Sequence, residues 1–221
     1  GVEMIECLTG FKWIAAVEAE REAKGQGTYV FGLEESYGYK VETEVMDKDG
    51  VSAAAMCAEM TMYWRSKGKS LLEHLDDMYK EYGYFEDRAI SKNFPGSAGV
   101  ETMAGIMTKL RTEGLKSLGG KKVTQIRDIG NSVSFDPENP SKKEAVNLPK
   151  SNVLQFFLEG GTIVSARPSG TEPKIKFYIN NRTEVGGAKC DKCLAAAKKE
   201  AVEVCNAIEA DINSILDAAS K

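Results

Sequence analysis

The chain has 221 residues and a net charge of −4, with 42% hydrophobic and 28% charged residues. This composition excludes a disordered chain and argues against general binding to nucleic acids, so any anion site must be built locally from a few cations. No apolar run approaches the ~20 residues that span a bilayer, and the first residues do not resemble a signal peptide, so we expect no membrane association. The five cysteines have irregular spacing, which indicates a reducing, cytoplasmic location.

The first part of the chain predicts an α/β domain. Helices begin at Phe11, Val51 and Leu71, and β-branched and aromatic residues over 28–33 predict a strand. The third helix opens with a capping box at Ser70–Glu73 and is closed by Gly83. Because the pattern changes there, we place a domain boundary between residues 83 and 84.

The second part, residues 84–221, predicts a sheet with helices. The expected strands cover 84–94, 122–129, 153–158, 162–166 and 175–179, and the helices begin after Ser97 and near Ala188. Residues 131–150 hold three prolines among polar residues and predict a long exposed loop. One antiparallel sheet with helices on one face fits this order, so the whole chain is of class α/β plus α+β.

A polar loop between two of these strands is the strongest candidate for a binding site. It has the sequence RPSGTEPK over residues 167–174. Arg167 can grip a phosphate with two parallel hydrogen bonds, Ser169 and Thr171 add hydroxyl donors, and Gly170 lets backbone N–H groups approach an anion. The alternative is an ordinary turn with Arg167 in solvent. Lys176 can add positive charge near the loop, although strand alternation predicts that its side chain points away.

A second candidate loop follows the strand over 28–33. It has the sequence GLEESYG over residues 32–38, and its carboxylate and hydroxyl groups, Glu34 and Ser36 among them, suit the hydroxyls of a sugar. The alternative is a solvated loop. Lys12 lies beside Gly10 at the start of the first helix, where it is either a surface lysine or a group that projects into a cleft.

Three other features predict structure rather than chemistry. Asp47 and Asp49 resemble a metal loop, but a helix begins directly after them, so Asp49 is expected to be its N-cap. Cys190 and Cys193 form a single CxxC pair, which predicts two thiols on a helix rather than a metal or redox site. The only histidine, His74, is expected to be a surface or helix-packing residue and not a catalytic base.

Taken together, the loops resemble a known family. TGFK at 9–12, GLEESYG at 32–38, DKDGV at 47–51 and RPSGTEP at 167–173 occur in this order, and the set is similar to the C-terminal part of the α-D-phosphohexomutases, the phosphoglucomutase/phosphomannomutase family. The resemblance implies that residues 1–83 are the later part of the third domain, which is α/β. It implies that residues 84–221 are the fourth domain, an antiparallel sheet.

The resemblance also implies roles for individual residues. Glu34 and Ser36 match the sugar-binding loop. Arg167, Ser169, Gly170 and Thr171 match the phosphate-binding loop, and Lys12 matches a lysine that faces the cleft. The family moves a phosphate between O1 and O6 of a hexose through a phosphoserine and a hexose 1,6-bisphosphate, with Mg²⁺ as cofactor. Such an intramolecular phosphotransferase is an isomerase of carbohydrate metabolism.

Two family motifs are missing from this sequence, the phosphoserine loop and the Asp-Gly-Asp magnesium loop. We therefore expect no catalytic or metal-binding residue here, and expect an inactive chain that binds phosphorylated hexose and works with N-terminal domains of the same enzyme. The alternatives are a phosphopentomutase-type relative, a separate sugar-phosphate binding module without catalysis, and a structural piece with no function of its own.

Overall fold

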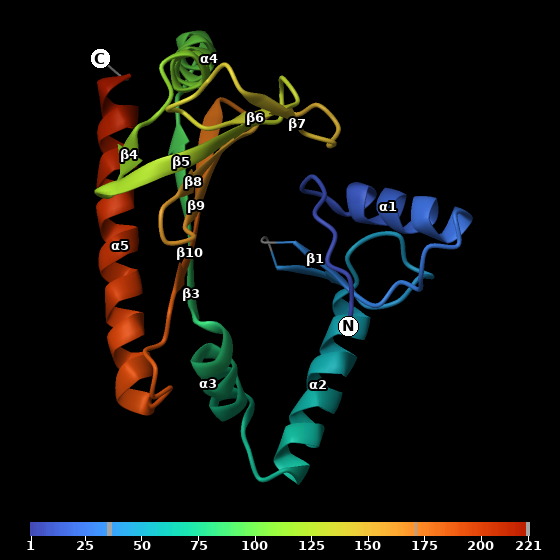
Figure 1. Cartoon of the computed structure of the whole chain (residues 1–221). Helices are drawn as coiled ribbons and strands as arrows, with labels where there is room; N and C mark the ends of the chain where they lie inside the picture. The colour runs from blue at the N-terminus through green and yellow to red at the C-terminus, as the bar shows by residue number, and fades with distance from the viewer. Residues whose placement is uncertain (35–36, 171, 220–221) are drawn as a thin grey trace. The chain divides into compact units, whose positions relative to one another are not determined.

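The computed structural model describes residues 1–34, 37–170 and 172–219. The chain divides into two compact units, Gly1–Leu75 and Asp76–Lys221, with the division inside helix α3 (Leu71–Tyr82). Figure 1 labels most of the elements of the two units. The predicted fold class is confirmed, because an α/β unit is followed by an antiparallel sheet with helices.

The first unit is built on a small hairpin and two helices. Its elements are α1 (Phe11–Ala23), β1 (Gly32–Glu34), β2 (Gly38–Lys40), α2 (Gly50–Ser66) and the first residues of α3. The observed strand begins only at Gly32, so the strand predicted over 28–33 is wrong for residues 28–31. A strand needs a hydrogen-bonding partner, and here β1 pairs only with the three residues of β2.

A buried ion pair joins α1 to β2. Lys40 is fully buried, and its Nζ lies 2.6 Å from a carboxylate oxygen of Glu18, which is 7% exposed. Lys40 Nζ also donates to the Glu42 carbonyl and lies 4.1 Å from the centre of the Tyr29 ring. Within the described residues the Glu18 oxygens have no other hydrogen-bond donor, so the carboxylate depends on Lys40.

The predicted caps of α2 and α3 are confirmed. Asp49 accepts a hydrogen bond from the Val51 N–H at 2.9 Å as the N-cap of α2. In the capping box, Ser70 N–H donates to Glu73 and Glu73 N–H donates to the Ser70 hydroxyl. Gly83 follows α3 with φ of 99°, a conformation that glycine adopts without strain.

Helix α2 differs from its predicted role. The sequence places Val51 and Met62 on one apolar side, yet α2 has no buried residue, and these two side chains are 82% and 68% exposed. The few described elements of the first unit offer no surface broad enough to cover a helix of 17 residues. His74 of α3 stacks on Trp64 of α2, with ring centres 3.5 Å apart, in agreement with a packing role.

The second unit is an eight-stranded antiparallel sheet with helices on one face (Figure 1). The strand order is β3-β10-β9-β8-β5-β6-β7, with β4 paired to β5. The elements are β3 (Tyr84–Asn93), α4 (Ser97–Thr112), β4 (Ser117–Leu118), β5 (Lys121–Asp128), β6 (Val133–Phe135), β7 (Lys143–Ala145), β8 (Leu154–Leu158), β9 (Ile163–Pro168), β10 (Lys174–Thr183) and α5 (Asp191–Ala218).

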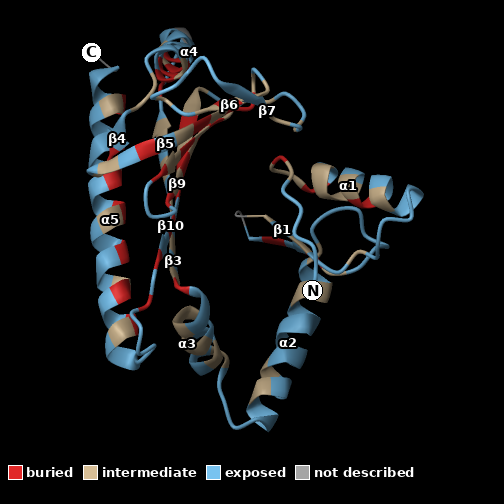
Figure 2. Cartoon of the chain, viewed as in Figure 1, coloured by how far each residue is buried: buried red, intermediate tan, exposed pale blue. Residues whose placement is uncertain are grey.

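Burial alternates along the central strands, so one face of the sheet is covered and the other is open. Ile175, Phe177 and Ile179 of β10 are at most 1% exposed, whereas the residues between them are half-buried or exposed. Both α4 and α5 contribute to the same core as these side chains. The buried residues of α5 lie on the side that faces the sheet (Figure 2). Alternation of period two therefore separates a core face from an open polar face.

The segment 131–150 is not the uninterrupted loop that its prolines predict. It contains β6 and β7, which pair with each other and extend the sheet beyond β5. Both strands have only three residues, and every residue of β7 is exposed. Strands this short and this polar show no alternation of hydrophobic residues, so the sequence does not predict them.

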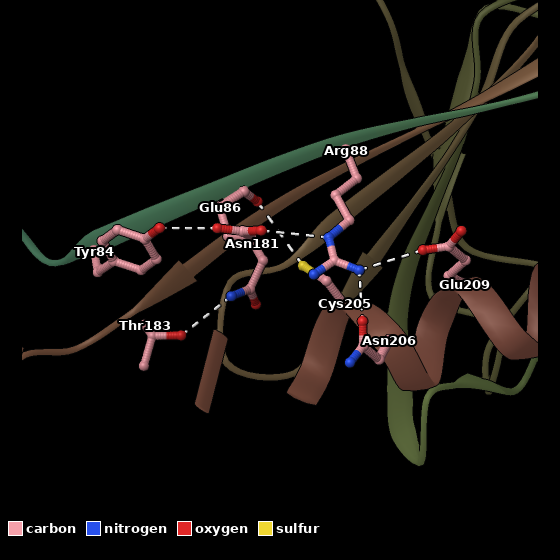
Figure 3. A network of polar contacts seen from close by, with 8 residues as sticks. All are labelled: Tyr84, Glu86, Arg88, Asn181, Thr183, Cys205, Asn206 and Glu209. Atoms are coloured by element: carbon pink, nitrogen blue, oxygen red, sulfur yellow. Dashed lines mark hydrogen bonds and ion pairs between the residues drawn. The ribbon is translucent and has the colours of Figure 1, made fainter. Parts of the chain in front are cut away.

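A polar network fixes strand β3 to helix α5 on the covered side (Figure 3). Arg88 donates to Asn206 at 2.6 Å and lies 3.3 Å from both Glu86 and Glu209. Tyr84 donates to Glu86 at 2.8 Å. These charge-assisted contacts fix the lateral position of α5, which apolar packing alone does not specify.

The buried ion pair yields the first prediction. Lys40→Met leaves the Glu18 carboxylate buried without a cation, so we expect the free energy of unfolding of the first unit to fall by about 3–5 kcal/mol. Urea unfolding followed by tryptophan fluorescence measures this change, because Trp13 and Trp64 both lie in the first unit.

A double variant, Glu18→Leu with Lys40→Met, removes both charges and is expected to recover most of the lost stability. If the double variant is no more stable than Lys40→Met alone, the ion pair is not the reason for the loss.

Candidate functional site

The strongest candidate site lies at the hairpin between β9 and β10. In this pair Arg167 is directly opposite Lys176, and Ala166 is opposite Phe177. Residues opposite each other in an antiparallel pair point to the same face. Because Ala166 and Phe177 are buried on the covered face, Arg167 and Lys176 lie side by side on the open face. The expectation that Lys176 points away from the loop is therefore wrong.

Within the described residues neither cation forms a close ion pair, although the charge of Lys176 contributes to the lowered pKa of the Glu172 carboxyl. Arg167 and Lys176 make no ion pair or hydrogen bond there through their side chains. Like charges directly opposite each other destabilise a sheet. By contrast, Lys174 is paired with Glu172 at 2.5 Å, and its hydrogen bond lowers the pKa of the Glu172 carboxyl. Two adjacent cations without a close ion-pair partner among the described residues form a ready site for a dianion such as a phosphate.

The turn after β9 is closed by its own backbone. Ser169 N–H donates to the Lys174 carbonyl at 2.8 Å, and Glu172 N–H donates to the Ser169 hydroxyl at 3.2 Å. Gly170 is exposed, and a Cβ added to it would meet no atom within 4 Å. Neither packing nor backbone conformation within the chain therefore requires glycine at this position. Thr171 lies outside the described residues.

A row of polar side chains continues across the open face beside the cation pair. Arg127 of β5 donates to Gln155 of β8 at 3.2 Å, and Gln155 donates to Ser165 of β9 at 3.2 Å. Ser165 is opposite Tyr178 of β10. Arg167 and Lys176 thus lie next to hydrogen-bonding groups on a polar surface rather than among apolar residues.

The second candidate loop joins β1 to β2 in the first unit. Glu34 is the last residue of β1 and is half-buried, opposite Gly38 at the start of β2. Tyr37 is 91% exposed and has φ of 60°, a conformation that is uncommon for residues other than glycine. Ser36 lies outside the described residues, so only Glu34 of the predicted pair is placed.

This hairpin packs tightly against the first turn of α1. A Cβ built on Gly38 would lie 2.4 Å from the Phe11 ring, and one built on Gly32 would lie 2.8 Å from Ile14. Glycine at both ends of the hairpin is therefore needed for close contact. Lys12 follows Phe11 and is exposed, with Nζ 5.3 Å from the centre of the Trp13 ring. Phe11, the residue before Lys12, therefore lies against Gly38, which is opposite Glu34 in the hairpin.

The described residues contain no group of three or more His, Cys, Asp or Glu side chains that could hold a metal ion. Asp49 is occupied as a helix cap, and His74 is stacked on Trp64. Among the described helices, none is long and apolar enough to cross a membrane.

Glycine at position 38 can be tested directly. Gly38→Ala is expected to push against the buried Phe11 ring and to lower the free energy of unfolding of the first unit by about 1–3 kcal/mol. Gly50→Ala is the matched control, because a Cβ there meets nothing within 4 Å. Equal stability of the two variants in urea would contradict the proposed contact.

Comparison with known proteins matches the first unit to one family domain. The family model for the α/β/α domain III of phosphoglucomutase/phosphomannomutase matches residues 1–82. The match ends at the last residue of α3, whereas the structural division lies inside that helix.

Similarity to individual proteins extends into the second unit. Phosphoglucomutase of Staphylococcus epidermidis is 35% identical over 179 residues, which cover 81% of this chain and 32% of that protein. Phosphoglucomutase of Staphylococcus saprophyticus is 33% identical over 183 residues, or 83% of this chain and 33% of that protein. The chain therefore spans about a third of the length of these relatives.

Among solved structures, the chain is similar to parafusin, a phosphoglucomutase from Paramecium, in its open form. The sequence identity is 17% and the TM-score is 0.47, with 88% of this chain and 33% of the parafusin chain covered.

Proposed function

Because this chain belongs to the α-D-phosphohexomutase family, we propose that it supplies substrate-binding surfaces of a mutase that interconverts hexose 1-phosphate and hexose 6-phosphate. In this proposal residues 1–83 are the later part of the third domain and residues 84–221 are the fourth domain. The relatives named above are phosphoglucomutases, which favours a glucose phosphate as substrate.

The observation that carries the proposal is that Arg167 and Lys176 lie opposite each other beside the turn of residues 168–173, with no close ion-pair partner among the described residues. We assign this turn, with Ser169, Gly170 and Thr171, to the phosphate that is not reacting. Arg167 would hold two phosphate oxygens, and Lys176 would add a second positive charge from the neighbouring strand. Since Gly170 has open space around it, a phosphate oxygen can approach its backbone N–H.

The sugar would be recognised by the first unit. Glu34 supports this role, because a half-buried carboxylate at the end of a strand can accept hydrogen bonds from sugar hydroxyls. Ser36 is assigned the same role on its position in the motif. Lys12, exposed on the first turn of α1, is assigned to the substrate phosphate or sugar.

The chemistry itself is proposed to take place on domains that this chain does not contain. A phosphorylated serine would give its phosphate to the sugar, and the resulting hexose 1,6-bisphosphate would turn over in the cleft and return its other phosphate to the serine. The sequence has neither the phosphoserine loop nor the magnesium loop of the family. Mg²⁺ would accordingly be held by those other domains, and this chain would bind and orient substrate.

Arg167 is the most informative residue to replace. We expect Arg167→Ala to weaken binding of glucose 1,6-bisphosphate by about 2 kcal/mol or more, and Lys176→Ala to weaken it less, because lysine contributes a single point charge. Isothermal titration calorimetry of the full 221-residue chain at low and at physiological salt measures both effects.

Lys150→Ala is the control, because it removes an equal charge from an exposed lysine outside the hairpin. Affinity that is unchanged by Arg167→Ala, or reduced equally by Lys150→Ala, would contradict a specific phosphate site.

A separate prediction follows from the proposal that the chemistry takes place on other domains. The purified chain is expected to convert no glucose 1-phosphate to glucose 6-phosphate, even with Mg²⁺ and glucose 1,6-bisphosphate present, while still binding the bisphosphate. A coupled assay for glucose 6-phosphate measures this, and turnover above the enzyme-free background would overturn the assignment. Absence of both turnover and binding would instead favour a structural role without a ligand.

A further inference from the structure

The CxxC pair at the start of α5 has a geometry that its spacing alone did not predict. Cys190 is the N-cap of α5, and Cys193 lies in the first turn. Their Sγ atoms are 2.7 Å apart, and the Cys193 N–H donates to Cys190 Sγ at 3.3 Å. Cys190 is exposed, whereas Cys193 is half-buried. The two thiols face each other, so a bond between them requires little movement of the backbone.

The surroundings of Cys193 keep it in place. It packs against a small apolar cluster formed by Val185, Leu194 and Ala197 together with Tyr79 and Tyr84. Lys80 pairs with Asp191 at 2.6 Å, between the two cysteines in sequence. Contacts with α3 therefore fix the first turn of α5, and this keeps the two thiols close to each other.

Two other cysteines, Cys7 and Cys205, differ from Cys190 in the direction in which the pKa of the thiol is shifted. Burial raises the pKa of Cys205 to about 11 and also raises the pKa of Cys7. The hydrogen bond from Cys193, followed by the N–H groups of the helix start, lowers the pKa of Cys190. Only the thiolate attacks a disulfide, so Cys190 is the most reactive of these three groups at neutral pH.

We propose that Cys190 and Cys193 form a reversible dithiol–disulfide couple that exchanges with small disulfides of the glutathione type. The exposed Cys190 is the attacking group, and the half-buried Cys193 is the resolving group. This role is independent of sugar-phosphate binding. A zinc site fits less well, since zinc takes four ligands and the described part of the chain holds no cluster of three or more candidates.

The exchange proceeds in two balanced steps. The Cys190 thiolate attacks one sulfur of oxidised glutathione, whose S–S bond breaks, and one glutathione thiolate leaves. Cys193 then loses its proton to water and attacks the Cys190 sulfur, which releases the second glutathione thiolate. The two protein thiols are oxidised to one disulfide, and the small disulfide is reduced to two thiols.

The test uses the full chain in buffers of varied glutathione to oxidised glutathione ratio, with trapping by acid, alkylation and peptide mass spectrometry. We expect one intrachain disulfide, Cys190–Cys193, which excess reduced glutathione or dithiothreitol reverses. In the reduced chain, iodoacetamide should modify Cys190 about tenfold faster than the exposed Cys57 at pH 7.

Two variants separate the roles of the thiols. Cys193→Ser should accumulate glutathione on Cys190 as a stable mixed disulfide, because the resolving thiol is gone. Cys190→Ser should abolish the disulfide and leave Cys193 slow to alkylate. The proposal is overturned if the unaltered chain accumulates mixed disulfide without closing the intrachain bond, or if Cys190 is alkylated no faster than Cys57.

Discussion

The antiparallel pairing of β9 with β10 determines what the second unit can do. It places the buried Ala166 opposite Phe177 and therefore forces Arg167 and Lys176 together on the opposite face. Helices α4 and α5 cover only the apolar face, so the face with the cations stays open to a ligand. If β9 shifted by one residue against β10, its side chains would change faces, so Arg167 would turn toward the core and Ala166 away from it. Packing of the core and presentation of the cation pair therefore depend on the same register.

Much of the fold could be predicted because its signals are local. The Asp49 cap, the Ser70–Glu73 capping box and the apolar face of α5 follow from short sequence patterns, and each is found in the structure. The predictions that the structure contradicts have a common cause. Strand formation over 28–31, burial of α2 and the pairing of β6 with β7 depend on which surfaces are available as partners, and no local pattern contains that information.

At the candidate site, too, local sequence patterns predict some residues, whereas others are understood only from the pairing of strands. Arg167 stands out in the sequence because its loop combines a guanidinium, hydroxyls and a glycine, but Lys176 acquires significance only once the strand register is known. Gly170 has open space around it, which leaves room for a ligand at this turn. For Cys190 and Cys193 the spacing alone favoured unreactive thiols, since the distance between sulfur atoms depends on how the first turn of α5 is formed. Ser36 and Thr171 rest on sequence alone.

The pairing of β3 with β10 has a consequence for how this chain is made. The two strands pair along ten residues each, from Tyr84 with Thr183 to Asn93 with Lys174, and β10 is the only neighbour of β3 in the strand order. A ribosome takes on the order of ten seconds to synthesise the segment between them. During that time residues 84–93 lack the strand with which they pair in the folded chain, and their hydrogen-bonding groups are open to other nascent chains. Pairing of β3 therefore cannot be completed until most of the second unit has been synthesised.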